Sequence, residues 1–313
     1  MRSREHGSKT PRKWEDLNEF GFAPGFVFTS KSTNSLTRNG CDSRKEDALP
    51  PEAVVTGIEK AMNATSETKS ESGLGETIRV VIHALLIALV IRTFLFQPFN
   101  IPSGSMKATL LVGDYLFVSK YSYGYTHYSI PFSPPIFSGR IFGREPNRGD
   151  VVVFRLPKDD TTDYIKRVIG LPGDRIQMKD GLLYINDVPV KRERLSDFIG
   201  EDPCGSDATA RVKRWKETLP NGVSYETLDC VDNGFYDNTN VYTVPPGHFF
   251  MMGDNRDNST DSRVLSAVGY VPFENLIGRA QMIFFSVAEG EHAWEFWRWP
   301  VSVRWNRIFS FVR

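Results

Sequence analysis

The 313-residue chain has few cysteines and histidines, and no excess of charge of either sign. Its three cysteines, Cys41, Cys204 and Cys230, lack the paired spacing of a structural zinc site, and no HExxH sequence is present. Lysine plus arginine and aspartate plus glutamate number 38 each, so no overall field favours nucleic acid as a partner. We therefore predict no metal, no other cofactor and no nucleic-acid partner.

Long hydrophobic runs are equally scarce, and the chain has one, from Ile78 to Phe96. As a helix, its 19 residues would span about 28 Å, enough to cross a bilayer core. Arg79 and Arg92 lie near its ends, and the bulky residues that follow do not form a signal-peptide cleavage site. We predict an uncleaved transmembrane signal anchor over residues 76–98, with a buried core helix as the alternative. Basic residues on both sides of the run leave its orientation open.

Residues 1–75 are polar and show no sustained helical or strand period. We predict a disordered cytoplasmic tail. The alternative is that translation starts at Met62.

A mainly β, antiparallel body is predicted after Asn100, because short period-two runs alternate there with Gly, Pro, Asn and Asp. Residues 99–190 and 241–288 form its expected catalytic core. Asp180-Gly181 between two alternating runs predicts a type I′ hairpin. The polar segment 191–240 interrupts the β pattern and predicts an insertion or cap.

The chemistry-bearing candidates begin just after the apolar run, where Ser103 and Ser105 flank Gly104. A serine nucleophile needs a base, and His127 and His248 are possible triad members although neither lies in a recognisable motif. Lys166 is the main competitor, since strand alternation gives it apolar neighbours on its own face. Desolvation costing about 3 kcal/mol would lower a lysine pKa to roughly 8, where it can act as a base.

The third chemistry-bearing segment, Met251 to Arg263, is rich in Asp, Asn and Arg and predicts a hydrogen-bonded loop. It lacks the glycine and closing glutamate of an EF-hand, which argues against calcium.

Four segments, NIPSGSM, RGDVVVF, YIKRVIGLPGD and GDNRDNSTDSR, follow the apolar run in this order. Together they resemble the successive boxes of bacterial type I signal peptidases, also called leader peptidases, which are membrane-bound serine proteases with a Ser-Lys dyad. The resemblance covers roughly residues 78–287. It implies a membrane-bound serine endopeptidase that removes signal peptides from exported preproteins after Ala-X-Ala-like sites.

The resemblance also implies roles for particular residues. Ser105 is the expected nucleophile and Lys166 the general base. Ser103 is expected to contribute to the oxyanion site, and Ser259 to orient Lys166. A supporting ion pair is expected between Asp261 and Arg263.

Further roles implied by the resemblance are structural. Asp254 and Asn255 are expected to shape the loop, and Thr260 to fill a variable position. Ile101 and Ile165 are expected to line small substrate pockets, although both could also be plain core side chains.

The expected partners are signal peptides and the lipid bilayer. The expected location is the bacterial inner membrane, crossed once, with the catalytic body on the periplasmic or outer side. The aromatic and arginine-rich tail, residues 289–313, fits an interfacial segment or an element packed on the core. In an extracytoplasmic body, Cys204 and Cys230 could form a disulfide.

Three other readings remain open on the sequence. A Ser-His hydrolase would use His248 as its base. A noncatalytic envelope protein would need neither Ser105 nor Lys166. A self-cleaving repressor of related fold would need a DNA-binding helix pair in place of the polar tail.

Overall fold

The structure, a computed structural model, describes residues 73–200, 204 and 210–313. Nearly all of the expected tail, with Met62 and Cys41, lies outside these residues. Leu74 and Gly75, which we expected to belong to the tail, are already helical.

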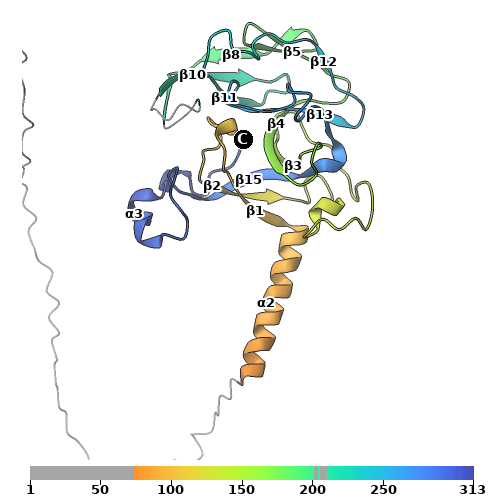
Figure 1. The fold of residues 1–313 in the computed structure, drawn as a ribbon, viewed down its shortest axis with the longest axis vertical. Coiled ribbons are helices and arrows are strands. Elements are labelled where there is room, and N and C mark those ends of the chain that lie inside the picture. The colour runs from red at the N-terminus through yellow and green to blue at the C-terminus, as the bar shows by residue number, and fades with distance from the viewer. Residues whose placement is uncertain (1–72, 201–203, 205–209) are drawn as a thin grey trace, which may run out of the picture. The chain divides into compact units, whose positions relative to one another are not determined.

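A single long helix, α2 (Leu74–Phe94), opens the described chain and is exposed along its length (Figure 1). Its 21 residues span about 31 Å, and its length and composition suit a membrane crossing. The expected anchor, residues 76–98, is divided: the helix ends at Phe94, and residues 96–98 belong to the first strand. Pro98 has no backbone N–H, which excludes it from a helix interior but not from an edge strand.

The body is built on a seven-stranded antiparallel sheet in the order β1-β2-β15-β3-β4-β13-β14. Its strands are β1 (Phe96–Asn100), β2 (Asp114–Ser119), β3 (Val151–Arg155), β4 (Asp163–Gly170), β13 (His248–Met252), β14 (Val271–Pro272) and β15 (Leu276–Ser286). Strands β3 and β4 bend away from β1, β2 and β15, so the sheet curls (Figure 1). The expected mainly β, antiparallel body is confirmed.

Two smaller sheets complete the body. One contains β5 (Arg175–Lys179), β6 (Leu182–Ile185), β7 (Val188–Pro189) and β12 (Tyr242–Thr243). The other contains β8 (Lys191–Arg194), β9 (Phe198–Gly200), β10 (Ala210–Thr218) and β11 (Ser224–Asp229). The segment 191–240, which we expected to interrupt the β pattern, therefore forms a sheet of its own. Its strands are polar because one face of this sheet is exposed.

The hairpin predicted at Asp180-Gly181 is present between β5 and β6. Lys179 pairs with Leu182, and both turn residues have positive φ, 47° and 71°, as a type I′ turn requires.

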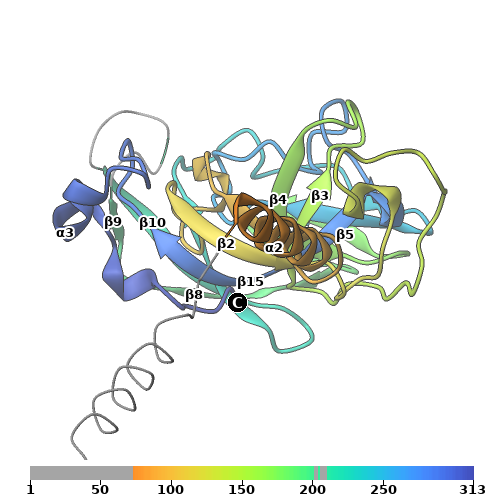
Figure 2. The same cartoon turned by 90° about the horizontal axis from the view of Figure 1, so that it is seen from below.

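The core lies on both faces of the curled sheet. Along β3, Val151 and Val153 face one apolar cluster while Val152 and Phe154 face another. Strand alternation produces this division, because successive side chains point to opposite faces. Figure 2 views the body from the α2 side, with the strands spread behind the helix.

The tail, residues 289–313, packs along β15 and contains η5 (Phe296–Arg298), α3 (Trp299–Ser302) and η6 (Trp305–Arg307). Val303 and Val312 are buried, and the Arg307 guanidinium donates to both carboxylate oxygens of Asp114 at 3.1 and 2.6 Å. Its large aromatic side chains remain exposed, namely Trp294, Phe296, Trp297, Trp305, Phe309 and Phe311. The tail is thus a packed element with an aromatic outer surface.

Candidate active site

Ser105 lies in a short 3₁₀ turn, η2 (Gly104–Met106), that follows β1. Two contacts from Asn255 hold this turn: its N–H donates to the Ser105 carbonyl oxygen at 3.1 Å, and its side-chain amide donates to the Gly104 carbonyl at 3.3 Å. The first N–H groups of such a turn have no partner within it, so they are available to a ligand. The Ser105 side chain is largely buried, with 9% of its surface exposed.

Lys166 stands in the middle of β4, where it pairs with Val152 of β3. Its side chain is 3% exposed, and its Nζ donates to Ser105 Oγ at 2.8 Å and to the Ile165 carbonyl at 2.9 Å. Nζ also lies 5.2 Å from the centre of the Tyr164 ring, the neighbour that strand alternation placed on the same face. Sheet curvature thus brings together two residues that are 61 positions apart.

Burial lowers the pKa of the Lys166 amine from 10.5 to about 8. The carboxylates of Asp261 and Asp254 oppose this shift, while Arg263 adds to it. Each carboxylate is itself paired with an arginine, which limits its ability to restore the charged amine. An amine with this pKa beside a serine hydroxyl can accept its proton near neutral pH, which is the chemistry of nucleophilic acyl transfer.

Asp261 and Arg263 form the expected ion pair, with Nε–Oδ1 and Nη2–Oδ2 distances of 2.9 and 2.8 Å. Burial by itself raises the pKa of the Asp261 carboxyl, but the arginine and the Gly253 N–H overcome it and hold the pKa below its ordinary value. The Gly253 N–H donates to Asp261 at 2.9 Å. The pair therefore fixes the backbone at Gly253, which packs directly against Ser105.

Gly253 is the point where the loop touches the nucleophile turn. A Cβ added here would lie 2.6 Å from the Ser105 carbonyl oxygen and would overlap the Ser259 side chain. We expect Gly253→Ala to move Ser105 by a large fraction of an ångström and to lower kcat about 100-fold, because catalysis is sensitive to such misplacement. The measurement is peptide-cleavage kinetics, with Gly222→Ala as control. Gly222 has no neighbour within 4 Å of an added Cβ but does have positive φ, so that variant tests mild strain without contact. Unchanged kcat in Gly253→Ala would contradict the expectation.

Ser103 and Ser259 differ in their contacts with Ser105 and Lys166. Ser103 Oγ lies 3.4 Å from Ser105 Oγ. The Ser259 hydroxyl is buried and lies beside the Asp261 carboxylate, whose pKa it helps to lower, so the expected contact with Lys166 is not formed in this structure. Ser259 instead packs beside Gly253, near the Ser105 carbonyl.

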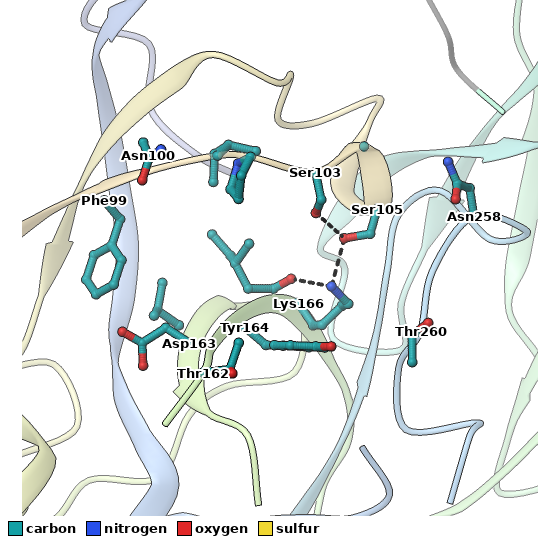
Figure 3. A pocket seen from close by; sticks show the side chains of 15 residues that line it. Phe99, Asn100, Ser103, Ser105, Thr162, Asp163, Tyr164, Lys166, Asn258 and Thr260 are labelled. Carbon is teal, nitrogen blue, oxygen red and sulfur yellow. Dashed lines mark hydrogen bonds between the residues drawn. The ribbon is translucent and has the colours of Figure 1, made fainter. Parts of the chain in front are cut away.

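Ser105 and Lys166 open into a cavity of about 390 Å³ (Figure 3). Ile101 and Ile165 both line it. So does Thr260, which we expected only to fill a variable position; Thr260 is exposed, whereas Ser259 and Asp261 on either side of it are buried. Figure 3 shows Ser103 and Lys166 pointing toward Ser105 from two sides, with Asn258 beyond it. The other lining residues are Phe99, Asn100, Pro102, Gly104, Val153, Thr162, Asp163 and Tyr164.

The histidine candidates lie elsewhere. His248 lines a separate cavity, where its Nδ1 lies 2.9 Å from the Pro246 carbonyl oxygen. His127 Nδ1 lies 3.7 Å from Glu274. Neither lines the cavity that contains Ser105, so the geometry gives Ser105 a lysine neighbour and not a histidine.

Sequence reasoning missed the partner of Asp254. Arg167, adjacent to Lys166, has no exposed surface and binds Asp254 through Nε–Oδ1 and Nη2–Oδ2 contacts of 2.8 and 2.7 Å. Thr109 donates to the same carboxylate at 2.5 Å, and Arg167 also donates to backbone oxygens of Gly149 and Arg313. An arginine followed by the apolar residues Val168 and Ile169 in the buried half of β4 was the available signal, because a buried charge requires a partner.

A disulfide joins Cys204 and Cys230, as the sequence had suggested for an extracytoplasmic body. Cys230 comes directly after β11, and its N–H donates to Asp257 at 2.7 Å. The disulfide therefore lies beside the loop that holds Ser105. Within the described residues, no group of three or more His, Cys, Asp or Glu side chains could hold a metal ion.

Comparison of the chain with known proteins shows which family it belongs to. The protein-family model described as "Signal peptidase, peptidase S26" matches residues 74–285, two-thirds of the chain. This chain belongs to the signal peptidase I family. Signal peptidase I of Rickettsia typhi is 45% identical over 263 residues, covering 78% of this chain and 96% of that protein. Signal peptidase I of Rickettsia canadensis is 42% identical over 268 residues, covering 79% and 97%.

A crystal structure of a signal peptidase I from Enterococcus faecalis is 26% identical and covers 44% of this chain and 97% of that one, with a TM-score of 0.25. As a signal peptidase I, the chain is a serine endopeptidase of family S26 that cleaves signal peptides. This sets aside the noncatalytic and repressor readings. Signal peptidase I is a membrane-anchored enzyme, and α2 is suited by length and composition to be the anchor.

Proposed function

We propose that this signal peptidase I cleaves after Ala-X-Ala-like sites, with Ser105 as nucleophile and Lys166 as general base. The observation that carries the proposal is the 2.8 Å distance between Lys166 Nζ and Ser105 Oγ, together with a lysine pKa of about 8. With the amine neutral, the serine hydroxyl can donate its proton to Nζ as Oγ attacks the scissile carbonyl.

The reaction then proceeds in two steps, formation of an ester on Ser105 and hydrolysis of that ester. The protonated Lys166 returns its proton to the leaving amine as the C–N bond breaks, which leaves an ester on Ser105. Lys166 next takes a proton from water as the water oxygen attacks the ester. Breakage of the C–O bond returns that proton to Ser105 and releases the signal peptide. All proton transfers in this scheme use only the two side chains, water and the leaving amine.

Ser103 and the Ser105 N–H are the proposed oxyanion donors. The Ser103 hydroxyl lies beside the nucleophile, and the Ser105 N–H belongs to the first residues of a 3₁₀ turn. One such donor is worth about 10²–10³ in kcat. We assign Ser259 to orient Lys166 in the substrate complex, where its buried hydroxyl would accept a hydrogen bond from the Lys166 amine.

Ile101 and Ile165 are the proposed walls of the small substrate pockets. Ile101 is 3% exposed and belongs to the core, while Ile165 is partly buried against the same cluster. Branched side chains fixed by core packing leave room for alanine but not for a large residue, which supports an Ala-X-Ala preference.

We place the enzyme in the bacterial inner membrane, crossed once by α2, with the body on the periplasmic or outer side. The disulfide favours an oxidising compartment. Ser105 lies 11 positions after Phe94, the last residue of α2. Even fully extended, this segment reaches at most about 40 Å. The site therefore stays near the bilayer that holds the substrate's apolar segment.

The test compares wild type with Ser105→Ala, Lys166→Ala and His248→Ala in detergent, on a preprotein with an Ala-X-Ala site. We expect wild type and His248→Ala to cut after the second alanine at similar rates and the other two variants to be inactive, as followed by product mass. Normal cleavage by Lys166→Ala would remove the lysine from its role.

The pH dependence gives an independent check on the base. Because the neutral amine is the active form, kcat/KM should rise with pH and level off above about 8. At pH 7 roughly one-tenth of the enzyme would carry the neutral amine. A rise of kcat/KM centred near pH 6.5, the ordinary pKa of histidine, would contradict Lys166 as the base.

A further inference from the structure

The loop that precedes β3 carries an uncharged, apolar tip. Residues 130–139, IPFSPPIFSG, contain no Asp, Glu, Lys or Arg. Phe132 is fully exposed and Ile136 is 69% exposed, and Phe142 beyond them is 85% exposed. Solvent-exposed apolar side chains gathered on one loop indicate a surface that meets something other than water.

Several positions of this tip leave no backbone N–H group that needs water as a partner. Pro131, Pro134 and Pro135 have no N–H group to satisfy. The N–H groups of three other residues bond within the loop, Ile130 to His127, Ser133 to Ile130 and Ile136 to Pro134, at 3.2, 3.0 and 2.8 Å. Satisfying backbone donors internally is the requirement that a hydrocarbon environment imposes on a chain.

The base of the loop is rigid. Tyr125 and Ile141 exchange both backbone hydrogen bonds, at 2.9 and 2.8 Å. Gly124 lets the two sides approach so closely that a Cβ would overlap the Ile141 carbonyl. Arg140 donates to five carbonyl oxygens, which belong to Tyr123, Gly124, Phe273, Glu274 and Leu276. The apolar tip is therefore presented from a fixed platform.

This platform touches the end of α2. The Tyr125 hydroxyl donates to the Phe94 carbonyl at 2.9 Å, and the two rings meet edge to face with centroids 5.7 Å apart. Phe94 is the last residue of α2, so the loop root lies at the depth where the helix leaves the bilayer. Figure 1 shows the loop, in yellow-green, beside that end of α2.

We propose that the tip formed by residues 130–139 inserts into the lipid headgroup and acyl boundary as a second membrane contact. The inference rests on the proposed role of α2 as the membrane anchor. The lipid bilayer is the occupant because the tip is uncharged, most of its backbone N–H groups are either absent at proline or bonded within the protein, and its base is joined to the membrane helix. Two contacts fix the orientation of the body over the bilayer, whereas α2 alone would leave it free to tilt.

The test measures depth with a single environment-sensitive label. Each variant has Cys41→Ser as background, because Cys204 and Cys230 are bonded to each other. The label is attached at Ile136→Cys, at Leu85→Cys in the middle of α2, or at Phe235→Cys, an exposed residue between β11 and β12. Figure 1 shows these two strands on the far side of the body from α2.

In pure-lipid vesicles we expect the label at residue 136 to shift to the blue and to be quenched by nitroxide lipids at roughly 5–10 Å depth. The label at residue 85 should be quenched more deeply, and the label at residue 235 should respond only to aqueous iodide. Quenching at 85 without quenching at 136 would overturn the tip contact and leave the anchor intact. Absence of quenching at 85 would overturn both, whatever the cleavage assay gives.

The same labels distinguish lipid insertion of the tip from binding to a protein partner and from unspecific adsorption to the vesicle. Protection of residue 136 only in native membranes, and never in pure lipid, would assign the tip to a protein and overturn the proposal. Equal quenching at 136 and 235 would indicate unspecific adsorption and would overturn it as well.

Discussion

Replacing Lys166 with methionine is expected to abolish cleavage and to raise the free energy of unfolding at pH 7. The folded-state pKa is about 8 against 10.5 for the free side chain, a difference equivalent to about 3 kcal/mol. At pH 7 the folded protein bears this cost, because the buried amine is then mainly charged. Methionine removes the cost but loses the contacts with Ser105 and Ile165, about 1 kcal/mol each, so the net gain is about 1–2 kcal/mol.

The pH dependence of that gain has a definite sign. The unfolded chain binds more protons than the folded one between pH 8 and 10.5, so wild-type stability rises with pH in that window and the advantage of the variant disappears. The free energies of unfolding of wild type and variant, measured in detergent at pH 7 and pH 10, give the gain and its dependence on pH. Lys120→Met is the matched control, since Lys120 is also buried with a pKa near 8 but lies outside the catalytic cavity. That variant should still cleave a soluble peptide. A Lys166→Met protein less stable than wild type at both pH values would contradict the argument.

Asp254→Ala is expected to lower the free energy of unfolding by about 3–5 kcal/mol, the usual consequence of removing one partner from a buried ion pair. Arg167 would keep its charge with no exposed surface. Two of its remaining partners, the Thr109 hydroxyl and the Gly149 carbonyl, are neutral groups. Because the neighbouring Asn255 holds the Ser105 carbonyl, activity should fall with the loss of loop order.

Denaturant unfolding measures this cost, with Glu193→Ala as control. Glu193 pairs with Lys191 on an exposed strand, so its removal should cost less than about 1 kcal/mol. The double variant Arg167→Met/Asp254→Leu should recover most of the stability, because it leaves no buried charge. A cost for Asp254→Ala no larger than that of Glu193→Ala would show that Arg167 finds water or another partner.

The sequence was most informative where chemistry is local. The Asp180-Gly181 turn needed only two residues that tolerate positive φ, and the apolar run needed only its length. Alternation along β4 correctly placed Tyr164 beside Lys166. The limits of elements were less accurate: the helix ends at Phe94, earlier than the apolar run, because Leu95 forms the turn after the helix and the apolar Phe96 begins strand β1.

The sequence by itself determined the family, the membrane helix and the identities of the candidate serine and lysine, because motifs in fixed order and a long apolar run require no knowledge of long-range contacts. Only the tertiary structure decided that Ser105 and Lys166 meet, that Arg167 pairs with Asp254, and that Gly253 packs between Ser259 and the nucleophile turn. These contacts join strands and loops far apart in the chain. Their existence depends on how the sheet curls, which no local pattern encodes.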